Sequence, residues 1–277
     1  MKSMKSSESS LYTIDHLPID LPKDAMIHYP KMKLGSQESA RYFAKLLAPM
    51  VSDVIRSSPE QDDWVLTSPP LINICSGANW MCHHVYHLLK NSSSIPARIH
   101  LSMVEIQVSG EALSNPLTTP YSQLSVEERI ASRQREKQPL MHEEDFHGRA
   151  VVIINDINVS GTQQRFLETH FSKVSPAMIH WRYVINVDPL LGQAEPRLEY
   201  QLNTSSLGSL QEFTDLLIHE KMEYTGQCLW RLFALPTEEL ENISARLSPD
   251  QISKLLELAK IEDRWNDELL TLERKLP

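Results

Sequence analysis

The chain has 277 residues, a formal net charge of −9, a hydrophobic content of 41% and three cysteines. The negative charge argues against a nucleic-acid partner, because phosphate backbones require dense Lys and Arg. No apolar run approaches the length of a membrane span, and the polar start lacks the apolar core of a secretory signal. We therefore expect a protein of the reducing cytoplasm with no membrane partner and no structural disulfide.

The first hundred or so residues predict an irregular start followed by alternating helices and strands. We expect a flexible segment over 1–10, an irregular segment through Pro30, and then a helix that Ser36 caps. Residues 64–67 are typical of a short buried strand, and a loop with Ser76 and Gly77 leads into an apolar helix ending near Leu89. A further strand is expected within 98–108.

Residues 109–145 contain Pro, Ser and charged positions and little continuous apolar pattern. This composition predicts a segment that opens easily. Within it, Ser125 is followed three positions later by Glu128, which predicts a capped, charged helix that continues to Lys137.

The stretch 148–165, GRAVVIINDINVSGTQQR, is the most informative in the chain. Its β-branched run 151–154 predicts a central strand that is buried on both faces, ending at Asn155 and Asp156. Ser160, Gly161 and Thr162 then open a helix. Free N–H groups and the positive end of the dipole make such a helix start an anion site, which indicates a sugar-phosphate ligand.

The remainder of the chain predicts one more strand and then a change to mainly helical segments. Residues 179–187 are expected to form a strand, 198–202 are a candidate strand, and 207–234 and 237–271 are expected to be helices. Ser248 caps the last of these, with Gln251 at its third position. The alternation predicts a doubly wound, mainly parallel α/β sheet over 11–190 and a mainly helical lobe over 191–277.

The 148–165 stretch resembles the signature of the type I phosphoribosyltransferases: four apolar residues, two acid positions, three variable positions, then Ser-Gly and further polar residues. The resemblance implies that Asp156 holds the ribose hydroxyls of phosphoribosyl pyrophosphate, with Mg²⁺ as cofactor. It also implies that the loop wraps the 5-phosphate, and the loop residues are Asn158, Val159, Ser160, Gly161, Thr162 and Gln163. Three positions depart from the pattern: Asn155, Val159 and Gln163. Asn155 can bond a hydroxyl but brings no charge.

Residues 119–149, with Gln-x-Leu-Ser-x-Glu-Glu-Arg and Phe-x-Gly-Arg elements, resemble the competence-associated (ComF-like) branch of that superfamily. The resemblance implies that 109–145 is a mobile lid over the pyrophosphate, with Arg129 as its catalytic charge. It implies as well that the loop at Ser76 and Gly77 binds pyrophosphate through backbone N–H groups.

Each of these features also has a purely structural interpretation. The signature is compatible with a well-capped strand–turn–helix unit of another doubly wound domain, and the Ser76 loop with an ordinary turn between a strand and a helix. Arg129 fits an exposed charged helix equally well. His83 and His87 share a helix face as metal ligands would, but that helix also supplies core residues, so we expect no metal held by side chains.

Two functions follow. The first is a phosphoribosyltransferase that transfers the phosphoribosyl group to a nitrogen nucleophile with release of pyrophosphate. The alternative is a non-catalytic sensor or partner-binding protein for phosphoribosyl pyrophosphate or a nucleotide. The sequence does not identify the acceptor, and it leaves a homodimer open.

Overall fold

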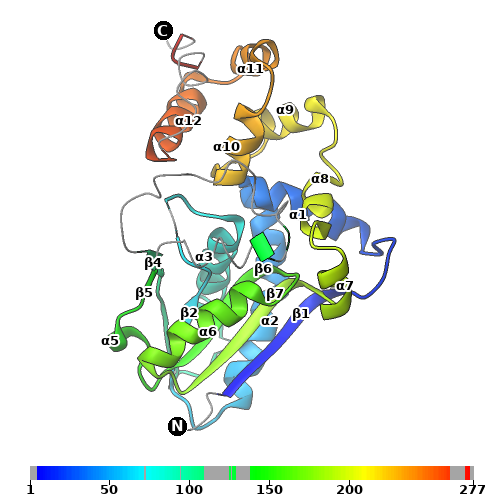
Figure 1. Ribbon diagram of the computed structural model, residues 1–277. Coiled ribbons are helices and arrows are strands. Elements are labelled where there is room, and N and C mark those ends of the chain that lie inside the picture. Colours follow the sequence, from blue (N-terminus) through cyan, green and yellow to red (C-terminus); the bar gives the residue numbers. More distant parts are fainter. Residues whose placement is uncertain are drawn as a thin grey trace.

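The computed structural model (Figure 1) describes residues 5–71, 73–93, 95–108, 125, 127–128, 138–262 and 272–274. Its centre is a five-stranded sheet in the order β1-β7-β6-β2-β3, in which every pair of neighbours is parallel. β4 and β5 form a separate antiparallel pair. The strands are β1 (Lys5–Ile14), β2 (Asp63–Thr67), β3 (His100–Met103), β4 (Gln107–Val108), β5 (Pro139–Leu140), β6 (Ala150–Asn158) and β7 (Met178–Val187).

Helices cover both faces of the sheet. On one face, β6 side chains such as Val152 and Ile154 pack with α1 (Lys23–Leu34), α2 (Gln37–Ser57) and α3 (Gly77–Lys90). On the other, Val151 and Ile153 pack with α5 (Glu143–Phe146) and α6 (Thr162–Val174), and α6 crosses in front of the sheet in Figure 1. The predicted doubly wound α/β fold with a mainly parallel sheet is confirmed.

The N-terminal region differs from the sequence-based expectation. The supposedly flexible start forms β1, which pairs with β7 along its length from Lys5↔Met178 to Ile14↔Val187. A polar segment can form an edge strand because its backbone hydrogen bonds, and not a buried face, hold it in the sheet. The irregular segment through Pro30 contains helix α1, which retains Pro30 in its interior because Tyr29 and Met32 are fully buried against the core.

The C-terminal third forms short helices, and those after residue 207 share a second core with Leu34 of α1, whereas Leu198 and Leu202 belong to the core beside the sheet. Leu198 and Leu202 form part of a helix and not a strand, because their spacing of four places both on one buried helical face. The helices predicted over 207–234 and 237–271 are each divided, since Thr225 caps a new helix within the first range and Ser248 caps a new helix within the second. The helices here are α7 (Pro189–Ala194), α8 (Leu198–Thr204), α9 (Leu210–His219), α10 (Gly226–Phe233), α11 (Thr237–Ser244) and α12 (Pro249–Glu262).

Several predicted caps are confirmed. The Ser36 hydroxyl accepts from Ser39 N at the start of α2, and Gln251 N donates to Ser248 Oγ at the start of α12. Ser125 and Glu128 make the reciprocal bonds of a capping box, at 2.7 and 3.2 Å. The predicted strand within 98–108 is two short strands, β3 and β4. Among the described residues, the search for a helix long and apolar enough to cross a bilayer finds none.

Candidate functional site

The carboxyl end of β6 carries the two residues that the signature places at its acid positions. β6 continues to Asn158, so Asn155 and Asp156 lie within the strand and not after its end. Both are buried, with exposed fractions of 3% and 8%. Because successive side chains of a strand point to opposite faces, Asn155 lies on the α6 side and Asp156 on the α1 side. The two positions therefore meet different partners.

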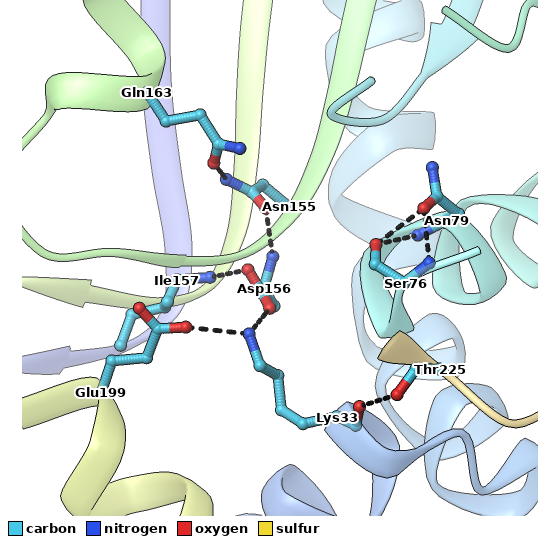
Figure 2. Close-up of polar contacts among 9 residues, drawn as sticks. All are labelled: Lys33, Ser76, Asn79, Asn155, Asp156, Ile157, Gln163, Glu199 and Thr225. Atoms are coloured by element: carbon cyan, nitrogen blue, oxygen red, sulfur yellow. Dashed lines mark hydrogen bonds and ion pairs between the residues drawn. The ribbon is translucent and has the colours of Figure 1, made fainter. Parts of the chain in front are cut away.

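Asp156 is part of a buried ionic cluster (Figure 2). One of its carboxylate oxygens contacts the Lys33 ammonium from α1, and Lys33 Nζ also donates to Glu199 Oε1 of α8 at 3.0 Å. The other Asp156 oxygen accepts from Ile157 N at 2.8 Å. We refer to Lys33, Asp156 and Glu199 as the ionic triad. Its two carboxylates and one ammonium carry a net charge of about −1 when all are ionised.

The triad is buried and charged. The side chains of Lys33, Asp156 and Glu199 are 9%, 11% and 8% exposed. Burial alone would lower the pKa of Lys33, but attraction to Asp156 and Glu199 outweighs it and holds that pKa above its usual value. The backbone of Lys33 is fixed as well, because Thr225 Oγ1 donates to its carbonyl oxygen at 2.7 Å. The C-terminal helices therefore contact the candidate site through Glu199 and through the Lys33 backbone.

Asn155 pairs with another departure from the signature. Its Nδ2 donates to Gln163 Oε1 at 3.0 Å, and its Oδ1 accepts from Asp156 N at 2.9 Å. Two positions where the family pattern expects an acid and a hydroxyl thus form an amide–amide contact. This contact joins the strand to the first turn of α6.

The loop between β6 and α6 is partly closed by its own bonds. Gly161, at φ 70°, is the N-cap of α6, and its N–H donates to Asn158 Oδ1 at 2.8 Å. The Ser160 and Thr162 hydroxyls bond one another at 2.9 Å. Val159 is buried, and its carbonyl would lie 1.9 Å from a Cβ on Gly192. Val159 therefore packs against α7 and offers its side chain to the interior.

What remains open in this loop is the start of α6. A glycine N-cap has no side chain to bond the first-turn N–H groups, so those donors keep the anion-binding character of a helix start. The exposed Arg165 adds a positive charge here, since its guanidinium donates to Ser160 O at 2.9 Å. Arg165 lies two residues after Gln163, the last position to which the resemblance assigns a role, which is why the motif did not single it out.

Ser76 and Gly77 lie at the start of α3 and have structural roles. Ser76 Oγ accepts from Asn79 N at 3.3 Å, while Ser76 N donates to Asn79 Oδ1 at 2.7 Å, which completes a capping box. A Cβ at Gly77 would lie 2.4 Å from Met32 Sδ, so this glycine permits α3 to approach α1. These contacts support the ordinary-turn interpretation of this loop.

The remaining predicted residue, Arg129, lies outside the described residues, as does most of the segment 109–145. In the part of the chain that is described, no group of three or more His, Cys, Asp or Glu could hold a metal ion. His83, weighed as a metal ligand with His87, contacts Glu105 Oε1 at 2.6 Å.

The donor set beside Asp156 does not fit a magnesium ion held by the protein. Mg²⁺ requires carboxylate oxygens or waters around it in octahedral geometry, whereas here an ammonium already contacts the carboxylate. Sequence analysis missed Lys33 and Glu199, because neither belongs to the signature and each is more than a hundred residues from its partner along the chain.

No protein-family model and no curated protein matches the chain. Solved structures do match, among them the hypoxanthine-guanine phosphoribosyltransferase of L. donovani, at 14% identity and a TM-score of 0.35 over 55% of this chain and 73% of that one. A hypoxanthine phosphoribosyltransferase from Staphylococcus aureus matches at 15% identity and 0.33 over 55% and 66%. That of Trypanosoma cruzi matches at 16% and 0.34 over 55% and 79%.

All three are phosphoribosyltransferases, the class whose signature the sequence resembles. The ComF-like branch stays a prediction from the sequence. At these identities and TM-scores the likeness does not extend to the chemistry of the site.

Proposed function

We propose that this protein binds phosphoribosyl pyrophosphate at the carboxyl end of β6 and transfers the phosphoribosyl group to a nitrogen nucleophile. One observation carries the proposal: a buried carboxylate, Asp156, and an α6 start without a side-chain cap flank one short loop. A ribose 5-phosphate needs such a pair, an acceptor for its hydroxyls and N–H donors for its phosphate.

In this proposal Asp156 accepts the ribose hydroxyls. Its two oxygens bond Lys33 and Ile157 N, and an ionised carboxylate has about four acceptor positions, so two can serve a ligand. The first turn of α6 and Arg165 bind the 5-phosphate. During transfer the C1–O bond to pyrophosphate breaks and the C1–N bond forms, pyrophosphate leaves with the electron pair, and the nucleophile gives its proton to water. Arg129 is proposed to neutralise the departing pyrophosphate.

A second candidate is a non-catalytic sensor for phosphoribosyl pyrophosphate or a nucleotide, and the ionic triad favours it. The Lys33 ammonium already neutralises much of the Asp156 charge, and the neutral Asn155 takes the place of a second acid in the strand. Glu199 and Thr225 link this site to the C-terminal helices, which gives a route from ligand binding to a partner-binding surface.

Calorimetry and a pyrophosphate-release assay test the two candidates together. The full chain is titrated with phosphoribosyl pyrophosphate, and release is followed with a panel of purine, pyrimidine and simple amine acceptors. Binding with turnover supports the transferase, in which case Arg129→Ala should lower kcat more than affinity. Binding without turnover for every acceptor supports the sensor. If the folded protein binds neither phosphoribosyl pyrophosphate nor a nucleoside mono- or triphosphate titrated in the same way, both candidates are excluded.

A further inference from the structure

The ionic triad contains a positive charge of its own, the Lys33 ammonium. This ammonium contacts the Asp156 carboxylate, which is proposed to bind the ribose hydroxyls. We infer that the Lys33 ammonium takes the place of a divalent metal ion beside Asp156, so that the ribose site works with a built-in positive charge. This inference rests on the proposed function for its ligand, but its chemistry comes from the three side chains alone.

The first support is the geometry of the cluster. Lys33 reaches Asp156 and Glu199 from a third element, and about nine-tenths of each side chain is buried. A divalent ion would have to expel the ammonium from between two carboxylates in order to coordinate either of them. Mg²⁺ also gives up its own waters reluctantly, which makes that exchange unfavourable at a buried position.

The second support is the number of charges. The strand has lost one acid of the signature, since Asn155 is neutral, but Glu199 of α8 brings a second carboxylate to the same cation. Two carboxylates around one positive centre is a donor set typical of a metal site, with an ammonium at its centre.

The third support is that Lys33 is held in place. It occupies the last turn of α1, where its carbonyl accepts from Thr225 Oγ1. The residue that caps the end of α1 is fixed too. Gly35, at φ 107°, approaches Glu223 so closely that a Cβ on Gly35 would lie 2.0 Å from the Glu223 carbonyl oxygen. An ammonium has three N–H groups, and Asp156 and Glu199 receive two of them. The third can be donated to a ligand oxygen.

The test has a ligand arm and a metal arm, both on the full-length chain. In the ligand arm, phosphoribosyl pyrophosphate is titrated in EDTA and in magnesium. The wild-type affinity should change by less than about threefold, whereas Lys33→Met should lose about tenfold or more in EDTA and recover part of it in magnesium. Lys31→Met is the matched control, because Lys31 lies in the same helix turn but pairs with Glu220 at 2.8 Å.

In the metal arm, Mn²⁺ binding is followed by the electron paramagnetic resonance of the free ion. Wild type and Lys31→Ala should bind no Mn²⁺ at the triad, Lys33→Ala should gain one site, and Lys33→Ala with Glu199→Gln should lose it. A thermal shift with Mn²⁺ in Lys33→Ala alone gives a second readout.

The outcomes are distinct. Three results would each overturn the inference. The first is Mn²⁺ binding by wild type that Asp156→Asn removes, and the second is a wild-type ligand affinity that rises about tenfold or more with magnesium. The third is a folded Lys33→Ala variant that gains no Mn²⁺ site. If wild type binds no ribose ligand under either condition, the proposed function fails, while the metal arm still decides what Lys33 replaces. If the Lys33 variants do not fold, the wild-type comparison of EDTA with magnesium decides.

Discussion

Two helix starts in this protein carry small residues and follow strands of the same sheet, yet they differ in what their polar groups do. At α3, Ser76 and Asn79 bond one another in a capping box and Gly77 lies against Met32. At α6, the N-cap is Gly161 in a left-handed conformation, and the first turn has no side-chain cap from it. A small-residue helix start is thus an anion site only where its donors are left open, which the sequence pattern alone does not reveal.

The neighbourhoods of the two starts differ as well. α6 begins four residues after the end of β6, whose Asp156 belongs to the ionic triad. The start of α3 has the neutral Ser68 as a neighbour, whose Oγ accepts from Asn79 Nδ2 at 2.8 Å. A charged carboxylate therefore precedes α6 along the chain, although its side chain lies on the α1 face of the sheet, whereas the side chains that bond one another at the start of α3 are neutral. Variants at each start should separate loss of stability from loss of ligand binding.

The largest effect is expected from Asp156→Ala. It breaks a buried ion pair, which typically costs about 3 kcal/mol or more of unfolding free energy, and it should also remove measurable binding of phosphoribosyl pyrophosphate. Urea denaturation and calorimetry measure the two losses. Asp53→Ala is the control, since its exposed pair with Arg56 should contribute less than about 1 kcal/mol. An unchanged ligand affinity for Asp156→Ala would show that Asp156 does not bind the ligand.

Gly77→Ala should be next in size, and it should act on stability alone. The new Cβ would overlap Met32 Sδ at 2.4 Å and its carbonyl oxygen at 2.7 Å, so overpacking should cost about 1–3 kcal/mol. Ligand affinity of the folded fraction should stay the same. If calorimetry showed instead a loss of affinity at unchanged stability, the start of α3 would belong to the binding site and the contrast with α6 would disappear.

Gly161→Val should have the opposite effect to Gly77→Ala, a loss of ligand affinity in a protein that stays folded. A Val at φ 70° costs about 1–2 kcal/mol of strain, but the nearest atom to the new Cβ is the flexible end of Arg165, so the protein should remain folded. The branched side chain obstructs the open N–H groups, and affinity should fall by about tenfold or more. Gly148→Val controls for strain, because Gly148 has φ 68° and open space around it. Equal ligand affinities for these two variants would contradict phosphate binding at the start of α6.

Ser76→Ala should remove the α3 cap at about 1 kcal/mol of stability without changing ligand affinity. Denaturation curves with and without phosphoribosyl pyrophosphate measure both quantities. A ligand-induced stabilisation smaller than that of wild type would mean that the Ser76 hydroxyl contacts the ligand after all.

Local patterns predicted much of this architecture and little of the triad. The β-branched run of β6 and the caps at Ser36 and Ser248 are short-range signals that the sequence displays directly. β1 was missed because edge pairing leaves no apolar alternation in a polar strand. Lys33 and Glu199 were missed because they meet only after α1 and α8 pack over β6, an arrangement that no local spacing encodes.

The effect expected to be smallest at neutral pH is a pH dependence of stability on the α3 side, which grows only in acid. Burial, followed by the nearby charge of Arg41, lowers the pKa of His84 to about 4, and its Nε2 contacts Gln37 Oε1 at 2.9 Å. In the unfolded chain a histidine titrates near about 6.5. The folded pKa is the lower one, so the unfolded state takes up the proton first. The stabilisation from neutral His84 is therefore complete above the unfolded pKa and is lost as pH falls from there towards about 4.

His84→Gln should accordingly flatten the dependence of stability on pH in that window while leaving ligand affinity at neutral pH unchanged. His180 on β7, whose pKa burial also lowers to about 4, should contribute a separate share, so the double variant should be flatter than either single one. Urea denaturation at a series of pH values measures the slopes. His84 lies in α3 and not near the start of α6, so the His84 variant should not change ligand affinity. A change in affinity would show that the two helix starts are coupled, and it would contradict the contrast between them.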